Sequence, residues 1–259
     1  MSSATLDTPS LDISGTQPVP LSRLVRVELR KRADTRASRW LLIAIVAITA
    51  LIIVIFFLTA NQSERTFINF MGVTATPQGF LLPVLGILLV TGEWTQRTAL
   101  VTFTMVPARG KVMAAKVLAA LLAGLAAIVV ALGIAALATV LGGADNAWSN
   151  IGLDDVGKFA LLQVMGVMQG LAFGLLFLIS AAAIVTYFVL PIAFSIVANL
   201  WGALKDAAPW VDLNTAQQPL FGATHITGEQ WLHIASATAI WVVLPFVLGL
   251  VRVLRAEVK

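Results

Sequence analysis

The stretch that joins two long apolar runs of this chain reads Gly92-Glu-Trp-Thr-Gln-Arg-Thr-Ala-Leu-Val-Thr-Phe-Thr-Met-Val-Pro-Ala-Arg-Gly-Lys-Val-Met-Ala-Ala-Lys116. It is far more polar than either flanking run. It carries one acid, Glu93, and four cations, which are Arg97, Arg109, Lys111 and Lys116. In a chain with water on both sides of a bilayer, so basic a segment is predicted to lie on the cytoplasmic side. The rest of the chain is expected to be a membrane bundle that holds this segment in place.

The composition indicates an integral membrane protein. Of the 259 residues, 59% are hydrophobic and 12% are charged, and the mean hydropathy is +0.92. A soluble domain is about 45–50% apolar and about 25% charged, so this chain has too much apolar surface to hide from water by folding on itself. The net charge of +4 is explained by basic cytoplasmic segments, and no nucleic-acid partner is expected. The absence of cysteine excludes disulfides and thiol chemistry.

Two segments precede the first apolar run. Residues 1–20 are rich in Ser, Thr, Asp and Pro and are predicted to be a disordered cytoplasmic tail. Residues 21–39 place apolar side chains at helical spacing and cations on the other faces, which predicts an amphipathic helix in the membrane surface. The alternative is a solvated charge run that only fixes the orientation of the chain. The cations assigned to the surface helix are Arg23, Arg26, Arg30 and Lys31.

Six apolar runs are predicted to cross the membrane as helices, and the first, residues 40–60, is long enough to cross about 30 Å of hydrocarbon. We expect the six spans to form one transmembrane domain over residues 40–259. The boundary between spans four and five is the weakest, because no charged residue marks the turn. The predicted spans are residues 40–60, 77–92, 112–141, 156–180, 181–201 and 230–251. The fold class is therefore an all-α integral membrane protein with six transmembrane helices.

Two ladders of small residues predict close helix contacts. In lipid, such close packing drives helix association in place of the hydrophobic effect. The first runs through span three and includes Ala119, Ala123 and Ala127. The second, in span four, is Gly166-x-x-x-Gly170-x-x-x-Gly174. It fits a subunit interface and packing within one chain equally well.

The distribution of cations predicts the topology. Six spans put both termini on one side of the membrane. The segment before span one, the Gly92–Lys116 segment and the carboxyl-terminal tail carry fourteen cations, and the opposite loops carry three: Arg65, Lys158 and Lys205. Both termini are therefore expected on the cytoplasmic side of a plasma membrane.

The sequence offers little material for catalysis or ion coupling. It contains no Gly-x-Ser-x-Gly elbow, no His-Glu-x-x-His and no P-loop, so the chain is not expected to be an enzyme or to bind ATP itself. His225 and His233 are interpreted as interface residues, and no metal site is expected. No charge lies well inside an expected span, which argues against a proton- or ion-coupled transporter. What remains is a bundle that conducts passively or is driven by a partner.

The order of motifs resembles the membrane (permease) subunits of bacterial type-two ABC exporters. The resemblance covers about residues 21–255. A basic amphipathic helix comes first, and six spans follow with Gly92-Glu93-x-x-x-x-Thr98, Pro107-x-Arg109 and Ala115-Lys116 between spans two and three. The chain departs from the family pattern around residues 180–183, which lack the polar or basic residue that many relatives carry.

The resemblance implies a permease that forms a dimer with a second copy or a homologue and binds two cytoplasmic ABC ATPase subunits. ATP and Mg would be held by those subunits, and no cofactor by this chain. Residues 21–39 would be the connecting helix and residues 93–111 the coupling segment. The residues assigned to coupling are Glu93, Arg97, Thr98, Phe103, Pro107 and Arg109. The alternative for this segment is a solvated basic loop that only enforces topology.

The expected function is that of the translocating subunit of an ATP-driven exporter of a hydrophobic or amphipathic substrate. The resemblance implies a path between two copies of spans two and five. The external segment, residues 205–229, is expected either to form short helices that cap the exit or to be a simple connecting loop. The alternative function is a non-transporting membrane scaffold that anchors cytoplasmic partners.

Overall fold

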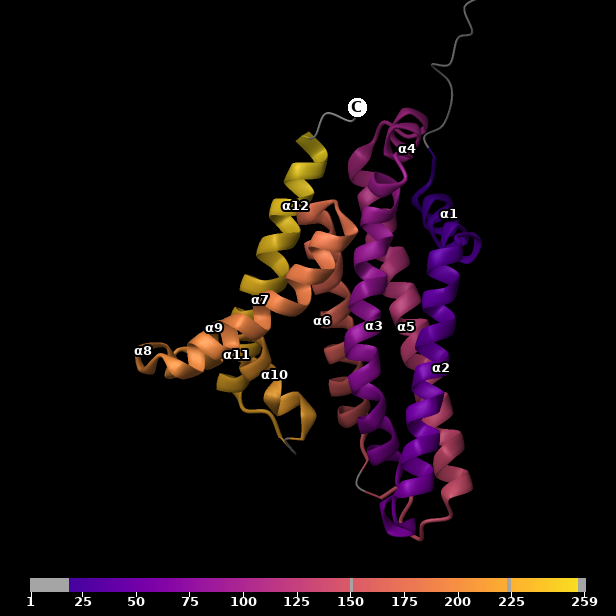
Figure 1. The fold of residues 1–259 in the computed structure, drawn as a ribbon, viewed down its shortest axis with the longest axis vertical. Coiled ribbons are helices and arrows are strands. Elements are labelled where there is room, and N and C mark those ends of the chain that lie inside the picture. The colour runs from indigo at the N-terminus through magenta and orange to yellow at the C-terminus, as the bar shows by residue number, and fades with distance from the viewer. Residues whose placement is uncertain (1–18, 150, 223–224, 256–259) are drawn as a thin grey trace, which may run out of the picture.

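The computed structural model describes residues 19–149, 151–222 and 225–255, and every regular element among them is helical (Figure 1). The expected disordered tail, residues 1–20, lies outside the described residues except for Val19 and Pro20. The long helices are α1 (Leu21–Asp34), α2 (Arg36–Thr59), α3 (Phe67–Thr95), α5 (Arg109–Gly142), α6 (Leu153–Phe177), α7 (Ser180–Leu200), α11 (Gly228–Thr238) and α12 (Leu244–Arg255). The short elements are η1 (Gln62–Glu64), α4 (Ala99–Met105), α8 (Gly202–Lys205), α9 (Ala208–Val211), α10 (Leu213–Gln217), η2 (Gln218–Phe221) and the π-helical η3 (Ala239–Val243).

The expected all-α fold is confirmed, and the described residues contain six helices that are long and apolar enough to cross a membrane. The second differs most from its predicted span, because α3 begins at Phe67 and not at residue 77. Pro77 and Pro83 both lie inside this helix, where neighbouring helices re-satisfy the backbone groups that proline frees. The sixth is a continuous run of α11, η3 and α12.

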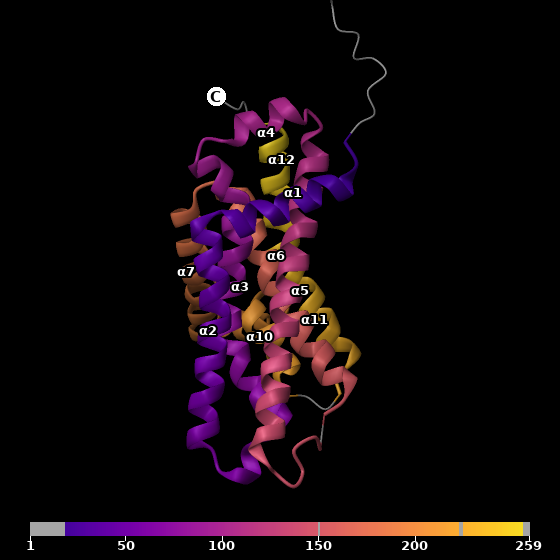
Figure 2. The same ribbon diagram turned by 90° about the vertical axis from the view of Figure 1, so that its right-hand side faces the viewer.

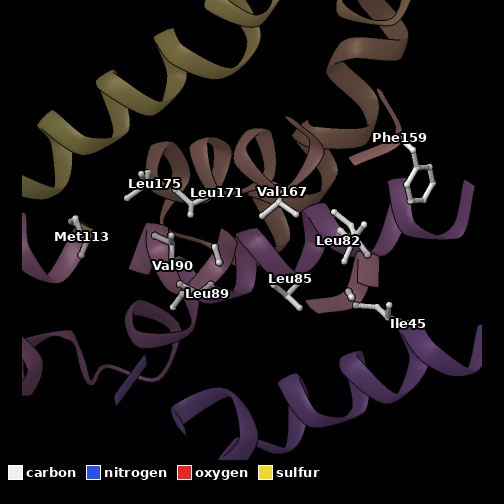
Figure 3. Packing of buried hydrophobic residues seen from close by; sticks show 14 of the residues in the cluster. Ile45, Leu82, Leu85, Leu89, Val90, Met113, Phe159, Val167, Leu171 and Leu175 are labelled. Carbon is white, nitrogen blue, oxygen red and sulfur yellow. The ribbon is translucent and has the colours of Figure 1, made fainter. Parts of the chain in front are cut away.

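Helix α3 is the centre of the bundle and packs against α2, α5, α6 and α7. Figure 3 shows Leu82 and Val90 of α3 near Val167 and Leu171 of α6. All four side chains are fully buried or nearly so. The hydrophobic core therefore runs along the line where α3 and α6 meet.

The small residues along that line allow the two backbones to touch. A Cβ added to Gly170 would lie 2.1 Å from the carbonyl oxygen of Pro83, and one added to Gly86 would lie 2.5 Å from the carbonyl oxygen of Val167. At Gly174 it would lie 3.1 Å from the carbonyl oxygen of Ile87. We call this contact the glycine junction (Gly86, Gly170 and Gly174). Gly170 and Gly174 of the span-four ladder thus pack against α3 of the same chain. A subunit interface that involves this ladder stays a prediction.

The alanine ladder lies on the inner side of α5. Ala119 is fully buried, Ala127 is buried and Ala123 is half-buried. Gly166, the first residue of the glycine ladder, makes an ordinary contact with the ring of Pro83, since an added Cβ would lie 3.4 Å from it.

The turn between α6 and α7 has only two residues. Leu178 adopts a left-handed conformation with φ of 59°, and its N–H donates to the carbonyl oxygen of Gly174. This closes α6 at Phe177, three residues before the predicted end of span four. A backbone hydrogen bond to a left-handed residue is enough to end a helix, so the turn needs no charged residue that would reveal it in the sequence.

The expected external segment forms short helices, α8, α9, α10 and η2, which lie beside the bundle part-way along its length (Figure 1). Asp212 is fully buried at the start of α10 and accepts hydrogen bonds from Ser195 of α7 and from Thr215. The indole N–H of Trp241 donates to the carbonyl oxygen of Val211. These bonds fasten the short helices to α7 and to the last span. A capping role at an exit stays a prediction.

Candidate functional site

The segment between the second and third spans folds into a compact cap at one end of the bundle. Helix α3 ends where Arg97 adopts a left-handed conformation with φ of 56°, and the N–H of Thr98 then donates to the carbonyl oxygen of Glu93. Helix α4 follows, and an extended link through Pro107 leads into α5. Figure 2 shows α1 lying across the bundle beneath α4. The expected coupling segment and the expected surface helix are therefore neighbours.

Four charged side chains meet where α1 crosses α3 and α5. The ammonium of Lys116 lies 2.8 Å from Glu28 Oε2 and 3.0 Å from Glu93 Oε1. The ammonium of Lys31 lies 2.8 Å from Glu28 Oε1 and 2.6 Å from the same oxygen of Glu93. We call these residues the charge cluster (Glu28, Lys31, Glu93 and Lys116). Its two acids and two lysines sum to zero.

Burial makes this pairing necessary. Lys116 is 2% exposed and Glu28 is 4% exposed. Removing a charge from water costs several kcal/mol unless partners and hydrogen bonds replace the water. Each carboxylate here contacts both lysines, so α1 is held against α3 and α5 by mutual neutralisation and not by apolar contact alone.

Lys31 is the member of the cluster closest to water, with a side chain 39% exposed. Desolvation acts to lower its pKa, but the hydrogen bonds that it donates to Glu28 and Glu93 outweigh this, and the pKa of Lys31 is raised. The lysine therefore stays charged at neutral pH. The hydroxyl of Thr102 also donates to Glu93 at 3.3 Å, which ties α4 to the same carboxylate.

The other residues assigned to coupling divide between the inside and the outside of the cap. Phe103 is buried beneath α4 next to the indole of Trp94. The guanidinium of Arg109 lies 5.2 Å from the centroid of the Phe103 ring and donates to the carbonyl oxygens of Val253 and Leu254. Arg97, Thr98 and Pro107 are exposed. The coupling role of all six assigned residues stays a prediction. Three of them, Glu93, Phe103 and Arg109, are positioned to support the cap from within.

The outer face of α4 is apolar. Leu100 is 46% exposed, Val101 58% and Met105 76%. Three of the cations assigned to the surface helix, Arg23, Arg26 and Arg30, are exposed on α1, whereas Lys31 belongs to the charge cluster. The site thus combines an exposed apolar face on α4 with exposed cations on the adjacent helix.

Sequence reasoning missed Glu28 and the burial of Lys116. Glu28 is the lone acid between Arg23 and Lys31 of a basic helix, and Lys116 follows Val112 inside an apolar run. Glu28 is an acid in a basic segment, Lys116 is a cation in an apolar segment, and the two charges are opposite in sign. That combination was the available signal, but nothing in the sequence placed α1 across α5.

No protein-family model matches the chain, and a comparison with curated proteins finds no match either.

Proposed function

We propose that this chain is the membrane subunit of a bacterial type-two ABC exporter, driven by ATPase subunits that dock on the face of α4. The observation that carries the proposal is the exposed apolar face of Leu100, Val101 and Met105 on a helix whose other face is anchored to the bundle. The order of motifs in the sequence supports the same assignment. The cytoplasmic location of this end is part of the proposal.

An apolar face on a short polar-flanked cap is unusual unless another surface covers it. Interfaces are centred on apolar side chains and ringed by polar ones. Around the α4 face, Arg97 and Thr98 are exposed and supply that ring, and arginine binds carboxylates with two parallel hydrogen bonds. A soluble subunit with an apolar groove and an acidic rim fits this surface.

The cap is mechanically continuous with two long helices. Thr102 of α4 bonds to Glu93 of α3, and Glu93 pairs with Lys116 of α5. A displacement of α4 by a docked subunit would therefore move α3 and α5, and α3 also carries the glycine junction with α6. Rigid movement of packed helices is an established way to pass such a displacement across a domain.

A second observation concerns the substrate. A cavity of about 350 Å³ lies between α3, α6, α7 and α10, with Phe80, Phe188 and Tyr187 among its aromatic lining residues. Gln169 lines it too and is buried, and its Nε2 group has no hydrogen-bond partner within the described residues. An amphipathic substrate with a hydrogen-bond acceptor suits these walls, in line with the expected hydrophobic or amphipathic cargo.

The test is co-purification of the chain with a candidate P-loop ATPase, followed by ATP turnover of the reconstituted complex. We expect Met105→Asp to weaken assembly about tenfold or more, because an apolar hot spot contributes above 1 kcal/mol and 1.4 kcal/mol is tenfold. The matched control is Leu153→Asp, which makes the same change at a 93% exposed leucine at the start of α6. It should assemble normally.

Retention of full assembly and turnover by Met105→Asp would overturn the docking face. The scaffold hypothesis makes a different prediction. Under it a soluble partner binds the same end, but no substrate stimulates ATP turnover and none moves across the membrane.

A further inference from the structure

A large cavity lies between α1 and α4 on the outer side of the charge cluster. Its volume is about 880 Å³, which is within the range of about 300–1,000 Å³ that small-molecule sites occupy. Its floor comes from the ends of α3 and α5, and Glu28, Lys31 and Glu93 line it there. Val101 and Met105 of the α4 docking face also line this cavity, whereas Leu100 does not.

Its walls are mostly hydrocarbon. Leu24 and Val27 line it from α1, Leu88 from α3, and Val101 and Met105 from α4. Val27 lines the cavity and is 43% exposed. Contact between these apolar walls and water is unfavourable. A hydrocarbon chain placed in the cavity would remove that contact.

The charges at the cavity favour an anion. Glu28 and Glu93 each pair with two lysines, so neither carboxylate is available for a cation. Lys31 uses two of the three donors of its ammonium on these acids and has one left. Arg23 lines the cavity, is exposed, and has no ion pair within the described residues. The unmatched charge at the cavity is therefore positive.

We propose that this cavity binds an anionic phospholipid of the surrounding membrane. Its phosphate contacts Arg23 and the free donor of Lys31, and an acyl chain lies against Leu24, Val27 and Met105. The source follows from the prediction that α1 lies in the membrane surface, where basic residues attract anionic lipids by about 1 kcal/mol each. The inference rests on that location and not on the proposed exporter function, although Val101 and Met105 belong to both surfaces.

The experiment measures lipid retained by the full-length chain in detergent, by native mass spectrometry and by thermal shift. The probes are dioleoyl phosphatidylglycerol and its neutral counterpart, dioleoyl phosphatidylcholine. We expect selective retention of the anionic lipid, and Arg23→Glu to weaken it about tenfold or more. The matched control is Arg26→Glu, which makes the same change at an exposed arginine of α1 that does not line the cavity. It should retain the lipid.

Two further variants separate the hydrocarbon part of the site from its charges. Val27→Trp and, independently, Val101→Trp fill the cavity without altering a charge, and either folded variant should lose the anionic lipid. Glycerol phosphate, which has the headgroup charge and no chain, should give no thermal shift. A chain lacking residues 2–18 should retain the same amount of lipid as the full chain.

Four results would overturn the proposal. They are equal retention of the two lipids, equal loss from Arg23→Glu and Arg26→Glu, a thermal shift from glycerol phosphate alone, and higher lipid retention after removal of residues 2–18. The last result would mean that the amino-terminal segment occupies the cavity in the full chain. ATPase assembly is tested with Met105→Asp, and lipid binding is tested with Arg23→Glu, whose side chain is not part of the α4 docking face, so either proposal can fail while the other stands.

Discussion

Helix α3 is held in two different ways at its two main contacts. At the glycine junction its backbone touches that of α6, and no side chain lies between them at Gly170. At the charge cluster its contact with α1 and α5 runs through long flexible side chains that carry four charges. The first contact depends on shape and tolerates no added atom. The second depends on electrostatic balance, and the loss of a fully buried charge upsets it.

The largest expected effect tests the balance of the charge cluster. Lys116→Met keeps an unbranched side chain of nearly the same length but leaves Glu28 and Glu93 buried with too little positive charge. Breaking a buried pair on one side costs about 3–5 kcal/mol, so we expect a large fall in thermal stability in detergent. Lys111→Met is the control, because Lys111 is exposed at the start of the same helix. Equal behaviour of the two variants would contradict the role given to the cluster.

The next effect tests the shape of the glycine junction. Gly170→Ala places a Cβ against the carbonyl oxygen of Pro83, and we expect a loss of about 1–3 kcal/mol from overpacking, measured by thermal unfolding. Gly157→Ala on the same helix has nothing within 4 Å of the added atom and should be neutral or slightly stabilising. If both variants unfold at the same temperature, the backbones of α3 and α6 are not in contact.

A smaller effect concerns the end of α3, just beyond the charge cluster. Arg97 adopts a left-handed conformation that costs a residue with a Cβ about 1 kcal/mol, and glycine adopts it freely. Arg97→Gly should therefore be at least as stable as the parent, and Arg97→Ala should not gain. The two variants also separate the charge of Arg97 from its backbone conformation. Both remove the charge, but only Arg97→Gly relieves the strain of the left-handed conformation. A less stable glycine variant would show that the charge of Arg97 stabilises the fold.

The smallest effect is expected at Lys31, which water partly screens. Lys31→Met should cost less than about 1 kcal/mol, the range of exposed ion pairs. Because the folded protein raises the pKa of Lys31, the protonated lysine stabilises the fold below its ordinary value of 10.5, and this contribution is lost as the pH rises through the folded value. The stability difference between parent and variant should hold at neutral pH and shrink in strong alkali. A difference that grows there would contradict the raised pKa.

The sequence predicted the helices better than their contacts. Length and hydropathy are local properties, so apolar runs were enough to predict six spans, and the four-residue spacing of the glycine ladder was enough to predict close packing. The contact partner of that ladder is a tertiary property, and only the fold places it on Pro83. The start of α3 at Phe67 was missed because proline is common as the first residue of a helix, so Pro77 resembled the start of the span, although residues 67–76 carry no charge and six of the ten are apolar.

The candidate site was predicted in part for the same reason. The position of Glu93 at a span end and the turn at Pro107 were visible in the sequence. The partnership of Glu28 with Lys116 joins residues 88 positions apart and depends on the angle at which α1 crosses the bundle. That angle is set by the single extended residue Thr35 between α1 and α2, a conformation that no periodicity reveals.

The pairing inside the charge cluster bears on how α1 could leave the bundle. Glu28 and Lys31 belong to the same helix, three residues apart, and already form an ion pair with each other. Glu93 and Lys116 likewise pair across α3 and α5. If α1 lifts away from the bundle, Glu28 stays paired with Lys31 on α1, and Glu93 stays paired with Lys116 between α3 and α5. Each of the two separated pairs is neutral. Detachment of α1 therefore strands no charge, which makes it the long helix best suited to move while the rest of the bundle stays folded.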